Sequence, residues 1–206
     1  MAEDERFLVA RKVVAIVGSY RKGGTIDTAV QAILEGAREK GAETQTIYLT
    51  EKHLEFCTNC RRCTQAPGPQ RGQCVQQDDL DSILQQIDAA DAIVLGSPVN
   101  FFNLTAIFRR FLERLAGYAY WPWGQASPVT RNKRLYRKAA LVTSSAMPGF
   151  LIPFFTGAPR ALRTTANILG ARPVGRLWIG LSALQPHQSL SAATLARARR
   201  IGLKLG

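Results

Sequence analysis

The stretch KVVAIVGSYRKGGTID, residues 12–27, runs from an apolar segment through a short polar turn towards a helix. Residues 13–17 form a continuous apolar run followed by glycine, which is typical of a buried strand in a parallel sheet. The helix expected around Asp27–Lys40 places Ala29, Val30, Ile33 and Leu34 on one face. A strand followed directly by an amphipathic helix predicts an α/β fold.

Strands and helices alternate along the rest of the chain. Further strands are predicted over residues 43–49, 91–98, 139–145 and 174–181, with helices over residues 78–87, 103–115, 159–169 and 189–205. Five strands alternating with five helices predict one doubly wound parallel sheet with helices on both faces. We expect a single domain over residues 1–206 with two excursions, a cysteine segment at 57–74 and a Trp- and Pro-rich, lid-like insertion at 118–138.

The turn at residues 18–27 has the composition of a phosphate site. Ligands of such sheets bind beyond the carboxyl ends of the strands, where the strand order reverses. This turn offers hydroxyls, positive charge and two glycines that let the backbone approach a ligand, just before a helix start. It has neither the lysine spacing of a P-loop nor a G-x-G-x-x-G pattern, so it favours a monophosphate. A ligand-free glycine turn is the alternative.

Two more loops follow strands that end at the same edge. The loop GSPVNFFN, residues 96–103, combines an extended backbone at Pro98 with two aromatic planes and two amides, which suits a flat heteroaromatic ring. The two phenylalanines are ordinary core residues in the alternative interpretation. The loop TSSAMPG, residues 143–149, adds small hydroxyl-bearing side chains for the polar edge of such a ring.

Together these loops resemble those of the flavodoxin-like NADPH-dependent FMN reductase superfamily, over roughly residues 12–180. The cysteine segment, the DDL that follows it and the GSPV strand end are similar to the iron–sulfur flavoprotein branch. The resemblance implies a three-layer α/β/α fold with strand order 2-1-3-4-5 and FMN as the cofactor.

The resemblance also implies the residues that bind FMN. They are Ser19, Arg21, Gly23, Gly24, Thr25, Ile26 and Asp27 at the phosphate, Ser97, Pro98, Val99, Asn100, Phe101, Phe102 and Asn103 at the isoalloxazine ring, and Thr143, Ser144, Ser145 and Gly149 along its pyrimidine side. Ile26 stands where the family usually has threonine, and Asn100 where it has tyrosine. Ring stacking is therefore expected from Phe101, Phe102 or an aromatic residue of the insertion, such as Trp121 or Trp123.

All four cysteines lie in one segment, with the spacing C-x2-C-x2-C-x10-C at Cys57, Cys60, Cys63 and Cys74. Three closely spaced thiols and a remote fourth are compatible with a [4Fe–4S] cluster. Zinc prefers two separated pairs, and free thiols or a disulfide need no metal at all. Arg61, Arg62 and Arg71 flank the thiols and favour thiolates, which suits a cluster and reactive free cysteines equally.

Charge is distributed unevenly along the chain. Residues 1–103 hold 11 Lys/Arg against 14 Asp/Glu, a net charge of −3, whereas residues 104–206 hold 16 Lys/Arg against Glu113 alone, a net charge of +15. This asymmetry indicates either an anionic partner, such as a phosphate-bearing cofactor or an acidic electron-transfer protein, or a solvated basic surface. The basic residues are spread over several predicted elements, so we do not expect nucleic-acid binding. The absence of a long apolar run predicts no membrane span and a cytoplasmic protein.

The sequence thus predicts an FMN-dependent oxidoreductase. Electrons would pass from NAD(P)H or ferredoxin through flavin to a quinone-like or other small acceptor, with no acid–base side chain needed. A non-catalytic flavoprotein electron carrier and a clusterless NAD(P)H:quinone or FMN reductase are the alternatives. The resemblance further implies a homodimer or homotetramer in which the insertion of one subunit covers the flavin of another.

Overall fold

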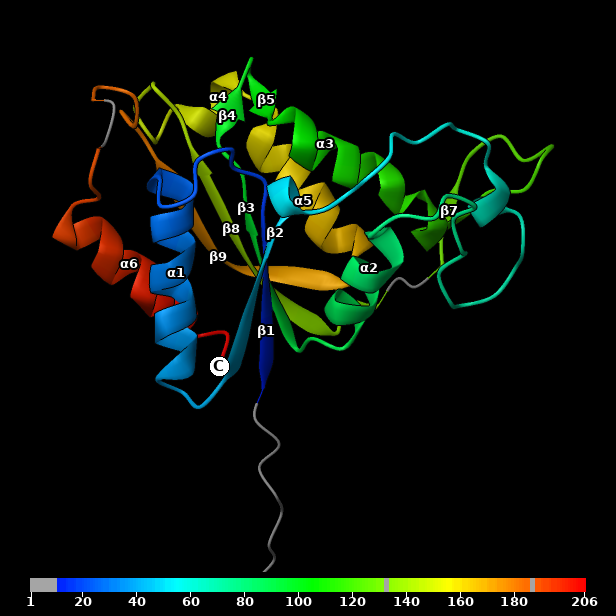
Figure 1. The fold of residues 1–206 in the computed structure, drawn as a ribbon, viewed down its shortest axis with the longest axis horizontal. Helices are drawn as coiled ribbons and strands as arrows, with labels where there is room; N and C mark the ends of the chain where they lie inside the picture. The colour runs from blue at the N-terminus through cyan, green and yellow to red at the C-terminus, as the bar shows by residue number, and fades with distance from the viewer. Residues whose placement is uncertain (1–10, 132–133, 186–187) are drawn as a thin grey trace, which may run out of the picture.

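The computed structural model describes residues 11–131, 134–185 and 188–206 (Figure 1). Its centre is a parallel sheet of β1 (Lys12–Val17), β2 (Glu43–Tyr48), β3 (Ala92–Gly96), β8 (Arg137–Ser144) and β9 (Ala171–Ile179). The strand order is β2-β1-β3-β8-β9, and every neighbouring pair is parallel. The predicted flavodoxin-like sheet with order 2-1-3-4-5 is confirmed.

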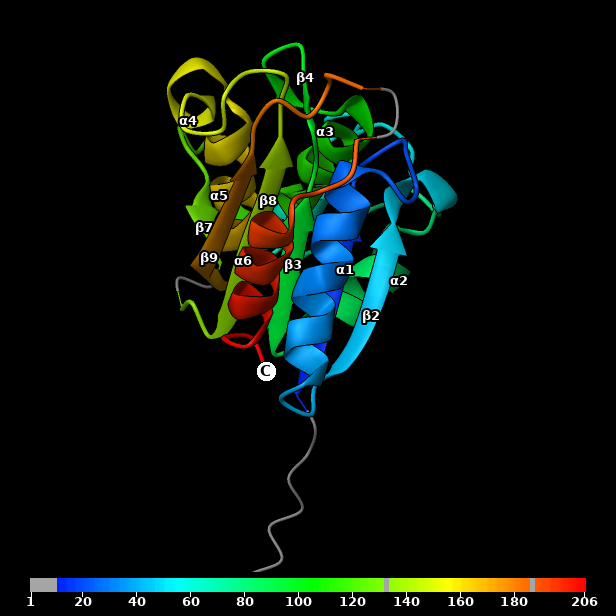
Figure 2. The ribbon, with the colours of Figure 1, turned by 90° about the vertical axis from the view of Figure 1, so that its left-hand side faces the viewer.

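Helices cover both faces of the sheet, as Figures 1 and 2 show. α1 (Thr25–Arg38) and α6 (Ala192–Gly202) pack on one face, and α2 (Leu80–Asp88), α3 (Ala106–Glu113) and α5 (Ala158–Ile168) pack on the other. Alternate residues of each strand point to opposite faces, which divides the core into two apolar clusters. None of the helices in the described ranges has the length and hydrophobicity needed to cross a bilayer.

Shorter elements modify the predicted boundaries. The hairpin of β4 (Val99–Asn100) and β5 (Asn103–Leu104) occupies the residues expected to begin the third helix, which starts only at Ala106, capped by Thr105. β8 and β9 begin earlier than predicted, at Arg137 and Ala171, because both pair along their whole length, with a register shift near Ala140. The described residues also form a one-turn helix, α4 (Ile152–Phe155), and three 3-10 turns, Leu49–Glu51, Arg62–Thr64 and Arg114–Tyr118.

The insertion predicted to be lid-like packs on the cysteine segment of the same chain. It forms the hairpin of β6 (Ala119–Tyr120) and β7 (Val129–Thr130); its residues 132–133 lie outside the described ones, and 137–138 belong to β8. The guanidinium of Arg61 lies 3.7 Å from the ring centroid of Trp121 and 4.2 Å from that of Trp123. Arg131 donates hydrogen bonds to backbone carbonyls of the cysteine segment, including Cys63 O at 3.1 Å. These contacts join the two excursions into one unit beside the sheet (Figure 1).

Helices α1 and α6 touch through their backbones at Gly202. A Cβ atom added there would lie 1.9 Å from the carbonyl oxygen of Ile33. We therefore expect Gly202→Ala to lower the free energy of unfolding by about 1–3 kcal/mol through steric overlap, although alanine normally favours a helix by about 1 kcal/mol.

Chemical denaturation of the Gly202→Ala variant measures this effect. Ala196→Gly on the exposed side of α6 is the control, since it changes helix propensity alone and costs about 1 kcal/mol. A Gly202→Ala protein as stable as the wild type would contradict the close approach of the two helices.

Candidate functional site

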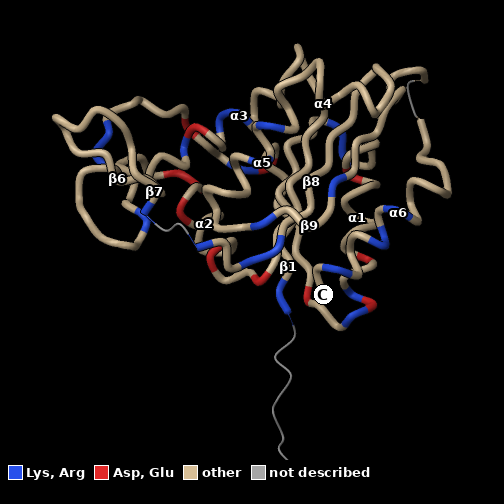
Figure 3. The backbone as a smooth tube through the Cα atoms, turned by 180° about the vertical axis from the view of Figure 1, so that it is seen from behind, with Lys and Arg blue, Asp and Glu red and all other residues tan. Residues whose placement is uncertain are grey.

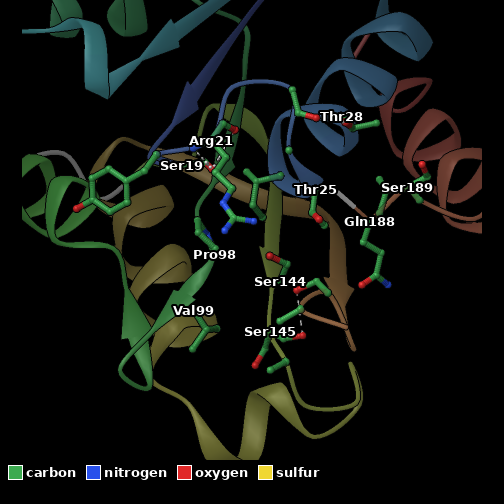
Figure 4. Close-up of a pocket in the computed structure, with 18 of the residues that line it drawn as sticks. Ser19, Arg21, Thr25, Thr28, Pro98, Val99, Ser144, Ser145, Gln188 and Ser189 are labelled. Atoms are coloured by element: carbon green, nitrogen blue, oxygen red, sulfur yellow. Dashed lines mark hydrogen bonds between the residues drawn. The ribbon is translucent and has the colours of Figure 1, made fainter. Parts of the chain in front are cut away.

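A pocket of about 1110 Å³ opens at the carboxyl ends of β1, β3 and β8 (Figure 4). Four loops line it: residues 19–25 after β1, residues 98–100 after β3, residues 144–146 at the end of β8, and part of the segment that joins β9 to α6. This position, beside β1 and β3, is where the strand order reverses and where doubly wound sheets bind ligands.

The loop after β1 is fixed by its own hydrogen bonds. The hydroxyl of Ser19 accepts the Arg21 N–H at 3.2 Å, and the carboxylate of Asp27 accepts the Gly23 N–H at 2.7 Å. Asp27 also accepts from the hydroxyl of Tyr48 at 2.9 Å, and burial together with this carboxylate raises the pKa of Tyr48. Gly23 has a φ of +73°, which favours glycine there. Asp27 therefore fixes the shape of the loop through its hydrogen bonds. Because the Gly23 N–H already donates to Asp27, it is not available to a ligand.

The start of α1 supplies donors that the loop does not use. Gly24 is the N-cap, and no side chain caps the helix there. The first amides of a helix have no intrahelical acceptor, and the helix dipole makes this end positive. Thr25 and Ile26 of this first turn line the pocket together with Ser19 and Arg21. Figure 4 shows the side chains of Ser19, Arg21 and Thr25 at the pocket. Amides, hydroxyls and a guanidinium thus converge in a form that suits an anion.

Only part of the predicted ring loop lies in the pocket. Pro98, Val99 and Asn100 line it. Ser97 is buried below, where its hydroxyl contacts that of Thr105 at 3.2 Å, and Thr105 donates to Gly18 O at 2.6 Å. Asn103 turns back to accept the Leu104 N–H at 2.9 Å. Ser97 and Thr105 therefore tie the ends of β1 and β3 to the start of α3.

The aromatic residues expected to stack on a ring lie elsewhere. Phe101 and Phe102 are exposed at the tip of the β4–β5 hairpin, and Trp121 and Trp123 pack around Arg61. None of these four is among the residues that line the pocket in the described part of the chain. Of the aromatic residues that the structure describes, Tyr20 lines the pocket, and its hydroxyl accepts the Ile107 N–H at 3.3 Å.

The third loop contributes two hydroxyls. Ser144 and Ser145 line the pocket, whereas Thr143 and Gly149 do not. Thr143 is fully buried, and its hydroxyl has no hydrogen-bond partner within the described residues. Gly149 packs against β9, where an added Cβ would lie 2.7 Å from Trp178 O.

One wall of the pocket consists of residues that were not predicted from the sequence. It is formed by the segment after β9 and the start of α6: Ser182, Ala183, Gln185, Gln188, Ser189, Leu190 and Leu195. Ser182 donates its N–H to Ser145 O at 3.0 Å, which ties this wall to the third loop. The topology could have indicated this wall, because the carboxyl end of the fifth strand lies at the same edge of the sheet as the carboxyl ends of the other strands.

The cysteines lie away from this pocket, in the unit formed with the insertion. Cys57 and Cys60 are exposed, while Cys63 and Cys74 are half-buried. The backbone N–H of Arg62 lowers the pKa of Cys60, while burial, followed by the neighbouring thiols, raises the pKa of Cys63. Among the residues that the structure describes, no three His, Cys, Asp or Glu side chains are gathered to hold a metal ion. As placed, the thiols therefore do not fit the predicted ligand set.

Among the described residues, a guanidinium outside the cysteine segment also contacts a thiol. Arg114, at the end of α3, donates to Cys74 Sγ at 3.4 Å and forms a buried ion pair with Asp78 at 2.6 Å. Arg61 instead binds the carbonyl of Trp121, and Arg71 pairs with Asp81 and Asp88. Of the three flanking arginines, Arg62 acts on a thiol as expected, because its backbone N–H and its charge lower the pKa of Cys60. The contact to Cys74 comes instead from a residue 40 positions later in the chain.

The pocket fits the two ends of FMN. A phosphate suits the uncapped start of α1 and the hydroxyls of Ser19 and Thr25. The two glycines leave the loop backbone uncovered; at Gly24 an added Cβ would lie 3.0 Å from that of Arg21. The extended residues 98–100 and the hydroxyls of Ser144 and Ser145 offer apolar and polar surface for a ring.

Known proteins are similar to this chain in sequence and in fold. A family model described as NADPH-dependent FMN reductase matches residues 11–182. An iron–sulfur flavoprotein of Archaeoglobus fulgidus is 33% identical over 111 residues, which cover 54% of this chain and 48% of the relative. An iron–sulfur flavoprotein of Methanocaldococcus jannaschii is 37% identical over 103 residues, which cover 50% of this chain and 51% of the relative. The chain thus spans about half the length of the curated relatives it matches, and the expected resemblance to iron–sulfur flavoproteins is confirmed in sequence.

Solved structures agree on the fold. The NAD(P)H:quinone oxidoreductase of Methanothermobacter marburgensis superposes with a TM-score of 0.69 at 19% identity, covering 96% of this chain and 100% of that one. An FMN-dependent NADH-azoreductase of Bacillus anthracis, solved in complex with FMN, gives a TM-score of 0.64 at 14% identity, covering 94% and 96%. At these identities the likeness shows the fold.

Proposed function

Because the chain belongs to the NADPH-dependent FMN reductase family, we propose that it is an FMN-dependent oxidoreductase. The observation that carries this proposal is the convergence of the loops after β1, β3 and β8 on one pocket beside an uncapped helix start. When bound, FMN supplies the redox chemistry, accepting a hydride or single electrons and passing them on.

The residues of the chain bind and orient the cofactor in this proposal. The amides of Thr25 and Ile26, with the hydroxyls of Ser19 and Thr25, hold the phosphate, and Arg21 adds positive charge. Pro98, Val99 and Asn100 lie along the ring, and the hydroxyls of Ser144 and Ser145 serve its polar edge. Asp27 and Ser97 hold the loops in place through hydrogen bonds to backbone N–H groups.

The proposed donor is NAD(P)H and the proposed acceptor a quinone-like or other small oxidant. The family to which the chain belongs, and the quinone oxidoreductase and azoreductase among its structural neighbours, support this choice. A ferredoxin donor has weaker support, because it rests on the cysteine segment. The cysteine spacing is compatible with a [4Fe–4S] cluster and some relatives are iron–sulfur flavoproteins, but the described thiols do not form its ligand set, so the proposed electron transfer does not include a cluster.

Anaerobic purification followed by activity assays tests the proposal. We expect a yellow protein that consumes NADPH or NADH in the presence of a quinone and added FMN, with little consumption when FMN is removed. Iron and sulfide analysis of the same sample tests the cluster separately. Nicotinamide and quinone turnover that does not depend on FMN would contradict the proposed function.

A further inference from the structure

A groove of about 590 Å³ lies at the edge of the sheet, between β9 and α6. Among the described strands β9 pairs only with β8, so its other side is an open edge, and α6 packs beside it (Figure 2). The groove is lined by residues 173–176 of β9 and by one face of α6. None of the described residues lines both this groove and the pocket, which opens at the carboxyl ends of the strands.

Both walls of the groove carry positive charge. Four exposed cations line it: Arg176, Arg197, Arg200 and Lys204. None of the four forms an ion pair with any residue that the structure describes. The sequence explains this, because residues 114–206 contain no Asp or Glu. Figure 3 shows Lys and Arg on α6 and at the start of β1.

The positive surface continues past the end of the groove. Lys138 donates to Lys204 O at 2.6 Å, and Arg11 donates to Gly206 O at 3.1 Å. Arg172, which is exposed, lies beside Lys138 in the register of β8 and β9. Burial, followed by the charge of Arg11, lowers the pKa of Lys138. The cations here are therefore close enough to act on one another.

Edge protection accounts for only part of this charge. Arginines, a proline and a β-bulge discourage an edge strand from pairing with other chains, and β9 has all three, with Pro173 next to the register shift near Ala140. The cations of α6 need another explanation. Arg197, Arg200 and Lys204 follow one another at i, i+3 and i+7, and like charges on one helix face repel.

The spacing of these cations indicates what the groove can bind. From Arg197 to Lys204 the helix axis advances about 10 Å, which is more than one small anion can bridge. An extended chain advances about 3.3 Å per residue, so a segment of four or more residues matches this length. None of the described lining residues is aromatic, so the bases of a nucleic acid would have nothing to stack on. Guanidinium groups bind carboxylates through paired hydrogen bonds, which favours a run of carboxylates.

We propose that the groove is a docking site for an extended, Asp- and Glu-rich segment of a partner protein. The side chains of the groove hold this segment, because Pro173 has no N–H to donate and Arg197 already donates to Arg176 O at 3.3 Å. Since the groove lies apart from the pocket, a partner docked there leaves the pocket open. The proposal does not rest on the proposed function.

Fluorescence anisotropy with a labelled octaglutamate peptide tests the proposal. Arg197→Gln/Arg200→Gln removes two of the four cations and is expected to weaken binding about tenfold, or about 1.4 kcal/mol. The Tm should not fall, because both positions are exposed and glutamine is a good helix former. Binding should also weaken as salt is added, because ions screen exposed charges.

Arg160→Gln/Arg163→Gln is the matched control. It removes the same charge at the same spacing, from exposed positions of α5 on the other face of the sheet, and should change the affinity less than twofold. A wild type that does not bind the peptide at low salt, or equal losses in the two variants, would overturn the proposal. Tighter binding of a thymidine octanucleotide than of the peptide would also overturn it. FMN affinity should be the same in the wild type and both variants.

Discussion

Replacing Asp78 by alanine is expected to lower the free energy of unfolding by about 3–5 kcal/mol. Asp78 and Arg114 form an ion pair in which both side chains are 1% exposed, and Asp78 also accepts the N–H groups of Glu55 at 2.7 Å and Leu80 at 3.1 Å. Its removal leaves a buried guanidinium without a counter-charge. Urea denaturation followed by circular dichroism measures the loss.

Asp81→Ala is the control for this prediction. Asp81 lies in the first turn of α2, three residues after Asp78, and also pairs with an arginine, Arg71, but its side chain is 57% exposed. Exposed pairs contribute about 0–1 kcal/mol, so this variant should remain close to the wild type. Equal losses in the two variants would contradict the role given to the buried pair.

The same pair predicts how stability depends on pH. Although burial raises the pKa of Asp78, hydrogen bonds from Arg114 and from two backbone amides outweigh it and hold the pKa below its usual 3.8. A carboxyl with a lowered folded-state pKa stabilises the protein above its unfolded pKa, and this stability is lost as the pH falls through the folded value. The difference in stability between wild type and Asp78→Ala should therefore shrink below about pH 4.

Thr25→Glu is expected to weaken FMN binding roughly 100-fold. Thr25 lies at the first position of α1 and lines the pocket where the phosphate is proposed to bind. A carboxylate about 5 Å from a phosphate costs about 3 kcal/mol at an effective dielectric constant near 20. The fold should persist, because glutamate at a helix N-terminus is favourable. Quenching of FMN fluorescence during titration measures the affinity.

Thr25→Gln separates charge from bulk in this test. Glutamine has nearly the size of glutamate but no charge, so it should retain most of the affinity that the Glu variant loses. The gap between the two variants should also narrow at high salt, because screening weakens the repulsion. Similar affinities for FMN in the two variants would show that the phosphate binds elsewhere.

The sheet was predictable because its signal is local. Apolar runs such as residues 13–17 and 92–95 are buried on both faces, and a helical pattern follows each of them. The strand order came from the resemblance, because periodicity alone does not specify which strands are neighbours. Some pocket residues were predictable because ligands bind at the carboxyl ends of parallel strands. Four residues that lie at or just after a strand end line the pocket: Ser19, Thr25, Pro98 and Ser144.

The features that could not be predicted from the sequence depend on contacts between segments that are distant along the chain. Nothing local distinguishes Arg114 from the other arginines; its burial arises because the end of α3 lies beneath the cysteine segment. The sequence pattern predicts that Phe101 or Phe102 stacks on the ring, whereas a two-residue turn directs both side chains to solvent. The Trp and Pro content of the insertion predicts a lid-like excursion but does not reveal that Arg61 and Arg131 join it to the cysteine segment.

Calorimetric titration of the cofactor-free protein with FMN and with riboflavin tests the central claim most directly. Riboflavin carries the same ring but no phosphate, so it reports what the start of α1 contributes. The account predicts one FMN per chain at micromolar affinity or better, and riboflavin binding weaker by at least tenfold, about 1.4 kcal/mol. No FMN binding, or equal affinity for both ligands, would contradict it.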